Sequence, residues 1–301
     1  MGFSSKLGRA IKDPRRVIRK TYEKVDESAG KKLFGNTVGL SRNVSGQFSQ
    51  NLNKKNIGKT SFLAEKLLDK QYLTVGKPFD ASLMNKIKER YDKMIRDNNY
   101  SFVVSEYEGK EYQRFIKFAI KNIPELKKLL TDEIVDIIEG YYGSHFKVIR
   151  VSCWRNYHIP TEIENKNELF SNKWHCDKRS TKLLKLFVNL SDITEKDGPF
   201  HVQSKQQTKE LMQKGFNSRA DYNIPTDVLE DPQHVVKAIG KSGSVFFSNT
   251  QFCLHKAGNP DEGKYRDMIQ WIFEPSRKPL EENWEEDVEP DDILQNMLKK
   301  E

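Results

Sequence analysis

The spacing of hydrophobic residues divides the chain into a helical part and a strand-rich part. Between residues 61 and 142 hydrophobic side chains recur every three or four positions, which is the period of a helix with one buried face. We expect a helix from Phe62, a second helix capped by Asp80, continued helical packing through Tyr112 and Ile120, and a last helix that begins at Pro124 and ends at Gly140. These stripes are typical of core packing.

The pattern changes after residue 144. Short runs rich in β-branched and aromatic residues alternate with turn-forming stretches, which is typical of strands. The expected strands are residues 146–154, 183–190, 244–247 and 266–273. Strands of this kind close as a barrel or as a jelly roll of two sheets. We therefore predict an α+β protein in which N-terminal helices buttress one sheet of a jelly roll.

Length and charge suggest one folded domain with two polar ends. The 301 residues carry a net charge of +8, and we place a single domain at residues 61–278, with a helical part at 61–142 and the jelly roll at 144–275. Residues 1–60 form a basic arm with 14 Lys and Arg against 4 Asp and Glu, and residues 279–301 form an acidic tail with 8 acidic residues between 281 and 292.

The basic arm leaves two interpretations open. Residues 4–24 have the pattern of an amphipathic helix interrupted at Pro14, which suits weak contact with an anionic membrane or an acidic partner. A solvated tail explains the same pattern. No segment has the apolar length of a membrane span or a secretory signal, and the three cysteines lack paired spacing. We expect a cytoplasmic protein, with peripheral membrane contact as the alternative, and no specific nucleic-acid partner.

Candidate chemistry is concentrated in Trp174-His175-Cys176-Asp177. In an extended backbone alternate side chains share a face, so His175 and Asp177 point the same way and Cys176 points away. The best third ligand is His255, which follows the strand-like residues 243–247. Two imidazoles and one carboxylate form the facial triad that suits non-heme Fe(II). The other histidines that we considered, His158, His201 and His234, are interpreted as structural.

A basic residue is predicted beside this triad. Residues 258–263 have strong turn character. If the chain doubles back there, His255 and Arg266 lie directly opposite each other on paired strands. Arg266 shares its strand face with Met268 and Gln270, and its planar guanidinium suits bidentate binding of a carboxylate.

From Phe146 to Pro275 the chain resembles the phytanoyl-CoA dioxygenase family of Fe(II)- and 2-oxoglutarate-dependent oxygenases. The resemblance rests on an ordered set of motifs: Trp-His-x-Asp at 174–177, Leu-Phe-Val-Asn-Leu-Ser-Asp at 186–192, Asp-Gly-Pro-Phe-His-Val at 197–202, Gly-Ser-Val-Phe-Phe at 243–247, His255 and Arg266. It covers a little under half of the chain.

The resemblance implies a cupin-like double-stranded β-helix with Fe(II) held by His175, Asp177 and His255. It also implies 2-oxoglutarate as a cosubstrate gripped by Arg266, and O2 as the oxidant. The expected reaction is hydroxylation of an aliphatic carbon of a small-molecule or carrier- or lipid-linked substrate, with 2-oxoglutarate converted to succinate and CO2. Retention of Asp177 favours hydroxylation over halogenation, since halogenating relatives have a small residue there.

The chain departs from the family pattern at two places. Residues 204–207 are Ser-Lys-Gln-Gln where relatives have Pro-Gly-Ser-His, and Ala257 stands where relatives often have a Ser or Thr that holds the cosubstrate. Asn156 or Tyr157 is the expected replacement for that hydroxyl. On the next strand, Phe187 and Asn189 are expected to line the pocket if the opposite, apolar face packs on the helices.

Two other classes of function stay open. Cys176 and Cys253 make a zinc-dependent hydrolase conceivable, because thiolate and imidazole are zinc ligands. A metal-containing jelly-roll binding protein without turnover is the second alternative, although such a scaffold has no need of Arg266. The sequence does not identify the substrate.

Overall fold

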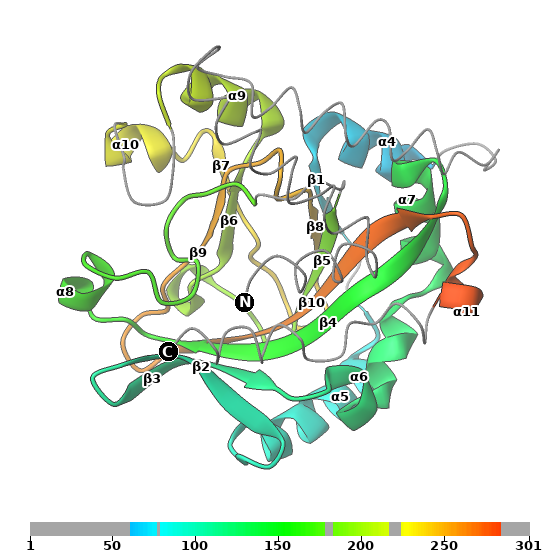
Figure 1. Ribbon diagram of the computed structural model, residues 1–301, viewed down its shortest axis with the longest axis horizontal. Coiled ribbons are helices and arrows are strands. Elements are labelled where there is room, and N and C mark those ends of the chain that lie inside the picture. Colours follow the sequence, from blue (N-terminus) through cyan, green and yellow to red (C-terminus); the bar gives the residue numbers. More distant parts are fainter. Residues whose placement is uncertain (1–60, 77–78, 178–182, 217–223, 284–301) are drawn as a thin grey trace, which may run out of the picture.

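Two antiparallel β-sheets face each other in the computed structural model, which describes residues 61–76, 79–177, 183–216 and 224–283 (Figure 1). The predictions for the basic arm at 1–60 and for most of the acidic tail lie outside these residues. Within the described part, no helix combines the length and the apolar character that a membrane span requires. The jelly roll predicted after residue 144 is confirmed.

The larger sheet has seven strands and the smaller sheet has three. In spatial order, the larger sheet consists of β1 (Tyr72–Val75), β8 (Val245–Ser248), β5 (Leu184–Asn189), β10 (Tyr265–Ser276), β4 (His145–Tyr157), β3 (Lys110–Ile116) and β2 (Ser101–Tyr107). The smaller sheet consists of β7 (Val235–Lys237), β6 (Phe200–Gln203) and β9 (His255–Ala257). The long strands β4 and β10 pair along their whole length and form the backbone of the larger sheet.

Helices cover one face of the larger sheet (Figure 1). The larger sheet is covered by α4 (Phe62–Lys70), α5 (Ala81–Ile95), the 3-10 helix η1 (Pro124–Leu129) and α7 (Asp132–Tyr142). The smaller sheet is flanked by α9 (Lys205–Gln213) and α10 (Thr226–Leu229). The remaining helices are single turns: α6 (Ala119–Asn122), α8 (Thr161–Glu164), η2 (Glu195–Asp197) and α11 (Leu280–Asn283).

Successive side chains of a strand point to opposite faces of the sheet, so one strand contributes to two different hydrophobic clusters. On β5, Leu184, Leu186 and Val188 pack against the helices in the largest hydrophobic cluster. Phe187, on the other face, packs between the two sheets, where its ring stacks on Phe200 with centroids 4.5 Å apart. The predicted division of this strand into a helix-facing and an inward-facing side is confirmed. The inward side is the one that carries the site.

The prediction that residues 61–142 are wholly helical is wrong, because three strands, β1, β2 and β3, lie within this range. Residues 72–75 form an edge strand, and residues 101–116 form the β2–β3 hairpin, which extends the larger sheet beyond β4. The hairpin turns at Glu108 and Gly109, both with positive φ, as tight hairpin turns require. Hydrophobic residues between 112 and 120 fit a helical period by coincidence, since Tyr112 and Ile116 are buried on a strand.

The single helix expected from Pro124 to Gly140 is also wrong. A 3-10 turn ends at Leu129, and α7 then begins afresh after Thr131, whose side chain accepts a hydrogen bond from the Ile134 N–H. The helix ends at Gly143, where a left-handed backbone closes it. By contrast, the predicted cap at Asp80 is confirmed, because its carboxylate accepts from the Leu83 N–H at 3.1 Å.

Candidate metal centre

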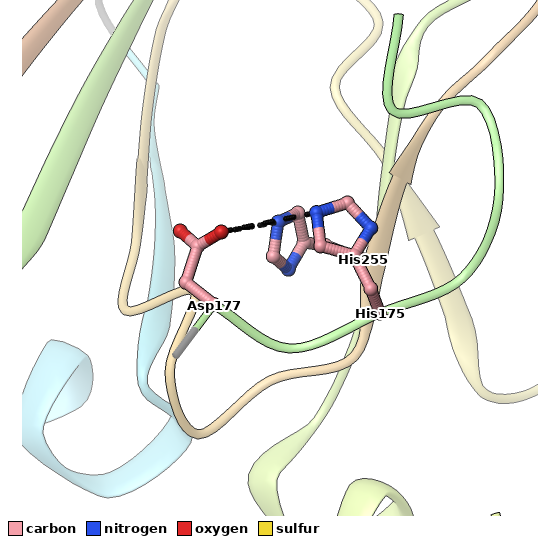
Figure 2. A group of neighbouring side chains, drawn as sticks. All are labelled: His175, Asp177 and His255. Carbon is pink, nitrogen blue, oxygen red and sulfur yellow. Dashed lines mark ion pairs between the residues drawn. The ribbon is translucent and has the colours of Figure 1, made fainter. Parts of the chain in front are cut away.

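Three side chains expected to hold a metal meet at the inner edge of the smaller sheet. One ligand atom from each of His175, Asp177 and His255 lies within 4.8 Å of the other two. Oδ1 of Asp177 is 3.8 Å from Nε2 of His175 and 3.9 Å from Nε2 of His255. Figure 2 shows the carboxylate directed at both imidazoles. Among the described residues this is the one group of three or more His, Cys, Asp or Glu side chains with such geometry.

Backbone pairing explains why distant histidines meet. His175 and His255 are directly opposite in an antiparallel bridge, and each donates its backbone N–H to the other's carbonyl at 3.0 Å. Directly paired residues share a face of the sheet, so both rings point inward. Their centroids are 4.1 Å apart. The Asp177 N–H donates to the Thr250 carbonyl at 2.9 Å, which fixes the third member against the loop before β9.

Both histidines are held with Nε2 directed to the common point. Nδ1 of His175 lies 2.8 Å from the Lys173 carbonyl, and Nδ1 of His255 lies 3.1 Å from the Cys253 carbonyl. A carbonyl oxygen accepts only, so each Nδ1 carries a proton and each Nε2 is the ring nitrogen directed to the common point. Burial lowers the pKa of His255 well below its ordinary value, and the neighbouring His175 lowers it further. This neutral tautomer is the one that binds metals.

The carboxylate of Asp177 is held so that only one of its oxygens faces the two histidines. Its Oδ2 accepts from the Thr250 hydroxyl at 2.5 Å and pairs with the Lys185 ammonium at 2.5 Å, which leaves Oδ1 facing the histidines. Burial alone would raise the pKa of Asp177. The positive charge of Lys185 and the hydrogen bonds from Lys185 and Thr250 outweigh that effect and hold the pKa well below its usual range. The carboxylate of Asp177 is therefore ionised, and only its Oδ1 faces the two histidines.

Arg266 lies on the inward face of β10, as predicted, but its strand partner is not the one that was predicted. The expectation that it pairs with His255 across a hairpin is wrong, because β9 belongs to the smaller sheet and β10 to the larger one. The turn at 258–263 carries the chain from one sheet to the other. Arg266 faces inward because it shares a face with Met268, a member of the cluster between the sheets.

The guanidinium of Arg266 is buried without an anion. It is 2% exposed, Nη1 donates to the Gly198 carbonyl, and Nε has no hydrogen-bond partner. Burial lowers its pKa to about 9, so it remains positively charged at neutral pH. None of the ion pairs among the described residues brings a carboxylate to it. An unpaired buried cation is costly, and such groups are usually matched by a ligand.

Gly198, the residue that Arg266 contacts, sits where a side chain does not fit. Its φ is +65°, and a Cβ there would lie 2.5 Å from the Pro260 nitrogen. The Gly258 N–H donates to the Pro199 carbonyl at 2.9 Å, so the two loops pack backbone to backbone. This contact explains why the Asp-Gly-Pro segment at 197–199 requires glycine, and it holds the carbonyl that Arg266 uses.

Asn156 is the better placed of the two residues considered as partners for a cosubstrate. It is directly opposite Arg266 across β4 and β10, whereas Tyr157 is on the other face of β4. Asn156 is 1% exposed, and its Oδ1 accepts from Nε2 of Gln113 at 2.9 Å. Its Nδ2 has no partner. A second unused donor thus lies beside the guanidinium.

Three contributors to the site were not predicted. Lys185 and Thr250 bind the second oxygen of Asp177, and Gln113 orients the amide of Asn156. Lys185 shares a strand face with Phe187, so period-two alternation placed it inward, but nothing in the sequence paired it with Asp177. Gln113 lies on β3, within the hairpin that the helical prediction missed.

The remaining histidines and cysteines are outside the triad. Nδ1 of His158 is 2.7 Å from the Pro260 carbonyl, and His234 is on the surface. His201 points away from the inner side of β6, on which Phe200 and Val202 pack. All three cysteines are free thiols, and Cys253 is buried in the cluster between the sheets. No cysteine belongs to the described group of candidate ligands.

No family model matches the chain, and no curated protein matches its sequence. Solved structures do match its fold. The α-ketoglutarate-dependent epimerase SnoN from nogalamycin biosynthesis is similar with a TM-score of 0.52 and 15% identity, over 71% of this chain and 82% of that one. The α-ketoglutarate-dependent carbocyclase SnoK of the same biosynthesis gives 0.52 and 14%, over 81% and 92%. EctD from S. alaskensis, solved with 2-oxoglutarate and 5-hydroxyectoine, gives 0.50 and 15%, over 76% and 80%.

These similarities establish the fold. The chain is an α+β protein with a cupin-like double-stranded β-helix core buttressed by N-terminal helices, as predicted. Membership of the phytanoyl-CoA dioxygenase family in particular stays a prediction. The reactions named for SnoN and SnoK are epimerisation and carbocycle formation, so the fold by itself does not select a reaction. Function has to be argued from the side chains of this chain.

Proposed function

We propose that this protein is an Fe(II)- and 2-oxoglutarate-dependent dioxygenase that hydroxylates an aliphatic carbon of a small-molecule or carrier- or lipid-linked substrate. His175, Asp177 and His255 would hold the metal, and Arg266 with Asn156 would hold the cosubstrate. When bound, iron and 2-oxoglutarate would supply the oxidation of a C–H bond by O2, with release of succinate and CO2. The chain's own residues position these groups and keep water away.

The unpartnered guanidinium of Arg266 is the observation that carries the proposal. In a protein that only binds a metal, nothing would offset the free-energy cost of removing the Arg266 guanidinium from water. A dicarboxylate would offset that cost if one of its ends bound the metal and the other bound Arg266. Nδ2 of Asn156, held in place by Gln113, offers a further donor to the same carboxylate. Ala257 cannot supply that bond, and Asn156 would replace the missing hydroxyl.

The donor set supports iron over zinc. Two neutral imidazoles and one monodentate carboxylate on one side of an ion leave several positions open, as non-heme Fe(II) oxygenases require. The thiols that would favour zinc are not among the candidate ligands. A hydrolase would need a general base near the ion. The described carboxylate nearest to the histidines, that of Asp177, is itself a proposed ligand.

Succinate formation tests the proposal. Purified protein loaded anaerobically with Fe(II) and then given 2-oxoglutarate, O2 and ascorbate should release succinate slowly without a substrate, and faster when a screened compound is hydroxylated. His255→Ala should release none. Retention of tightly bound zinc, or succinate at the rate of a metal-only control while the protein stays folded, would contradict the proposal and favour the zinc enzyme or the binding protein.

A further inference from the structure

A polar row crosses the larger sheet on the solvent side of the metal centre. Lys185 of β5 is directly opposite Ser248 of β8, which in turn is directly opposite Tyr72 of β1. Direct partners share a face, and the neighbouring residue Phe246 packs between the sheets. The row therefore faces inward, as the triad does. It places an ammonium, a hydroxyl and a phenol side by side.

Two groups in this row, the Ser248 hydroxyl and the Lys185 ammonium, can donate further hydrogen bonds. The Ser248 side chain is fully buried, and its Oγ has no hydrogen-bond partner. The ammonium of Lys185 carries three N–H bonds, and its one ion pair among the described residues is with Oδ2 of Asp177. A buried hydroxyl without a partner beside a cation is costly unless a ligand completes it. An acceptor with negative charge fits both groups.

Exposure separates this row from the proposed cosubstrate site. The side chains of Lys185 and Asp177 are 14% and 20% exposed, whereas Arg266 and Asn156 are 2% and 1% exposed. Solvent thus reaches the triad from the Lys185 side, and the Arg266 side is closed. A molecule that enters after the cosubstrate meets Lys185 first, because the Ser248 side chain is fully buried.

Charge balance points to the same class of ligand. With metal and cosubstrate bound as proposed above, the dication and the dianion cancel, and Asp177 neutralises one of the two cations Lys185 and Arg266. Among these groups of the described residues, one positive charge is left in a largely buried site. A substrate with a single negative charge removes that imbalance, and a phosphate monoester, which carries about −1.5 to −2 at neutral pH, exceeds it.

We infer that Lys185 and Ser248 form a carboxylate-binding subsite that selects a substrate with a single carboxylate group. This inference rests on the proposed function for the charge count and names the substrate class of the same site. Lys185 would then have two tasks, to hold Oδ2 of Asp177 and to anchor the substrate at a point separated along the sheet from Arg266, because Lys185 is directly opposite Ile272 of β10. Tyr72 flanks the subsite from the edge strand.

Binding of simple probes to the anaerobic Fe(II)·2-oxoglutarate holoenzyme tests the subsite. Butanoate, hexanoate and octanoate would each be compared by calorimetry with the corresponding amide. We expect the tightest-binding carboxylate to exceed its amide by at least about tenfold, since a hydrogen bond to a charged group contributes that much. Lys185→Met should abolish the preference, Ser248→Ala should reduce it, and Lys185→Arg should retain it. Lys241→Met, at an exposed lysine, should leave it unchanged.

The visible band of the Fe(II)·2-oxoglutarate chelate separates this inference from the proposed function. If wild type and Lys185→Met both form the band and the carboxylate preference is absent or survives Lys185→Met, the subsite is overturned and the function stands. Tighter binding of hexyl phosphate than of hexanoate would also overturn it. Loss of the cosubstrate in Lys185→Met but not in Arg266→Met would assign Lys185 to 2-oxoglutarate instead. If wild type forms no band, the proposed function itself fails.

Discussion

Replacing Arg266 with methionine should weaken 2-oxoglutarate binding by about 2–5 kcal/mol, the usual cost of truncating one partner of a buried charge pair. That corresponds to at least about 30-fold in the dissociation constant. The same change should raise the thermal midpoint of the protein without ligand, because it removes an unpaired buried cation. Function and stability should therefore move in opposite directions at this one residue. Titration of the cosubstrate and thermal melts measure the two effects.

Adding 2-oxoglutarate with metal sharpens the comparison. Wild type should gain stability from the cosubstrate by mass action, and the Arg266→Met variant should gain little. Arg90→Met is a suitable control, since this arginine forms a partly exposed pair with Glu125, and it should change neither quantity much. A variant that binds the cosubstrate as tightly as wild type, or that is strongly destabilised, would show that Arg266 has a structural role.

Replacing Asp267 with alanine should destabilise the fold by about 3–5 kcal/mol, because it leaves the buried guanidinium of Arg155 with only the half-exposed Asp92, 3.6 Å away, as an ion-pair partner. Asp267 is fully buried on the face of β10 opposite Arg266, and both its oxygens are 2.7 Å from the guanidinium of Arg155. The Tyr91 hydroxyl also donates to Asp267, at 2.8 Å. The pair thus fastens α5 to the strands that carry Arg266 and Asn156. Urea unfolding measures the loss.

A double replacement distinguishes a buried charge from a lost contact. Arg155→Leu combined with Asp267→Leu removes both charges, and we expect it to cost much less than Asp267→Ala alone. Asp192→Ala breaks an exposed pair with Lys241 and should cost at most about 1 kcal/mol. If the Asp267→Ala variant unfolds at the same urea concentration as wild type, the pair does not hold the sheet and helix together.

The meeting of His175, Asp177 and His255 was predictable because two of these residues are close in sequence. Alternation alone places His175 and Asp177 on one face, and the strand-like residues before His255 indicate that it sits near a sheet. The inward face of β10 followed from the same period of two, which correctly placed Arg266 with Met268. Local rules were sufficient for the side chains of the strands that were recognised as strands.

Relations between the sheets were not predictable from local rules. The turn at 258–263 looks like a hairpin, but the chain there crosses from the smaller to the larger sheet, so His255 and Arg266 have different strand partners. The β2–β3 hairpin was missed because its hydrophobic residues also fit a helical period. Contacts that depend on such long-range pairings, such as Lys185 with Asp177 and Gln113 with Asn156, became visible only in three dimensions.

The central claim is that one site joins a facial triad to a dicarboxylate clamp, and anaerobic titration tests it most directly. Fe(II) is added to the protein, then 2-oxoglutarate, and the weak visible charge-transfer band of the chelate is followed in wild type, His255→Ala and Arg266→Ala. We predict a band in wild type that is lost without His255 and weakened without Arg266. A wild-type protein that is folded and binds Fe(II) but forms no band would contradict the account.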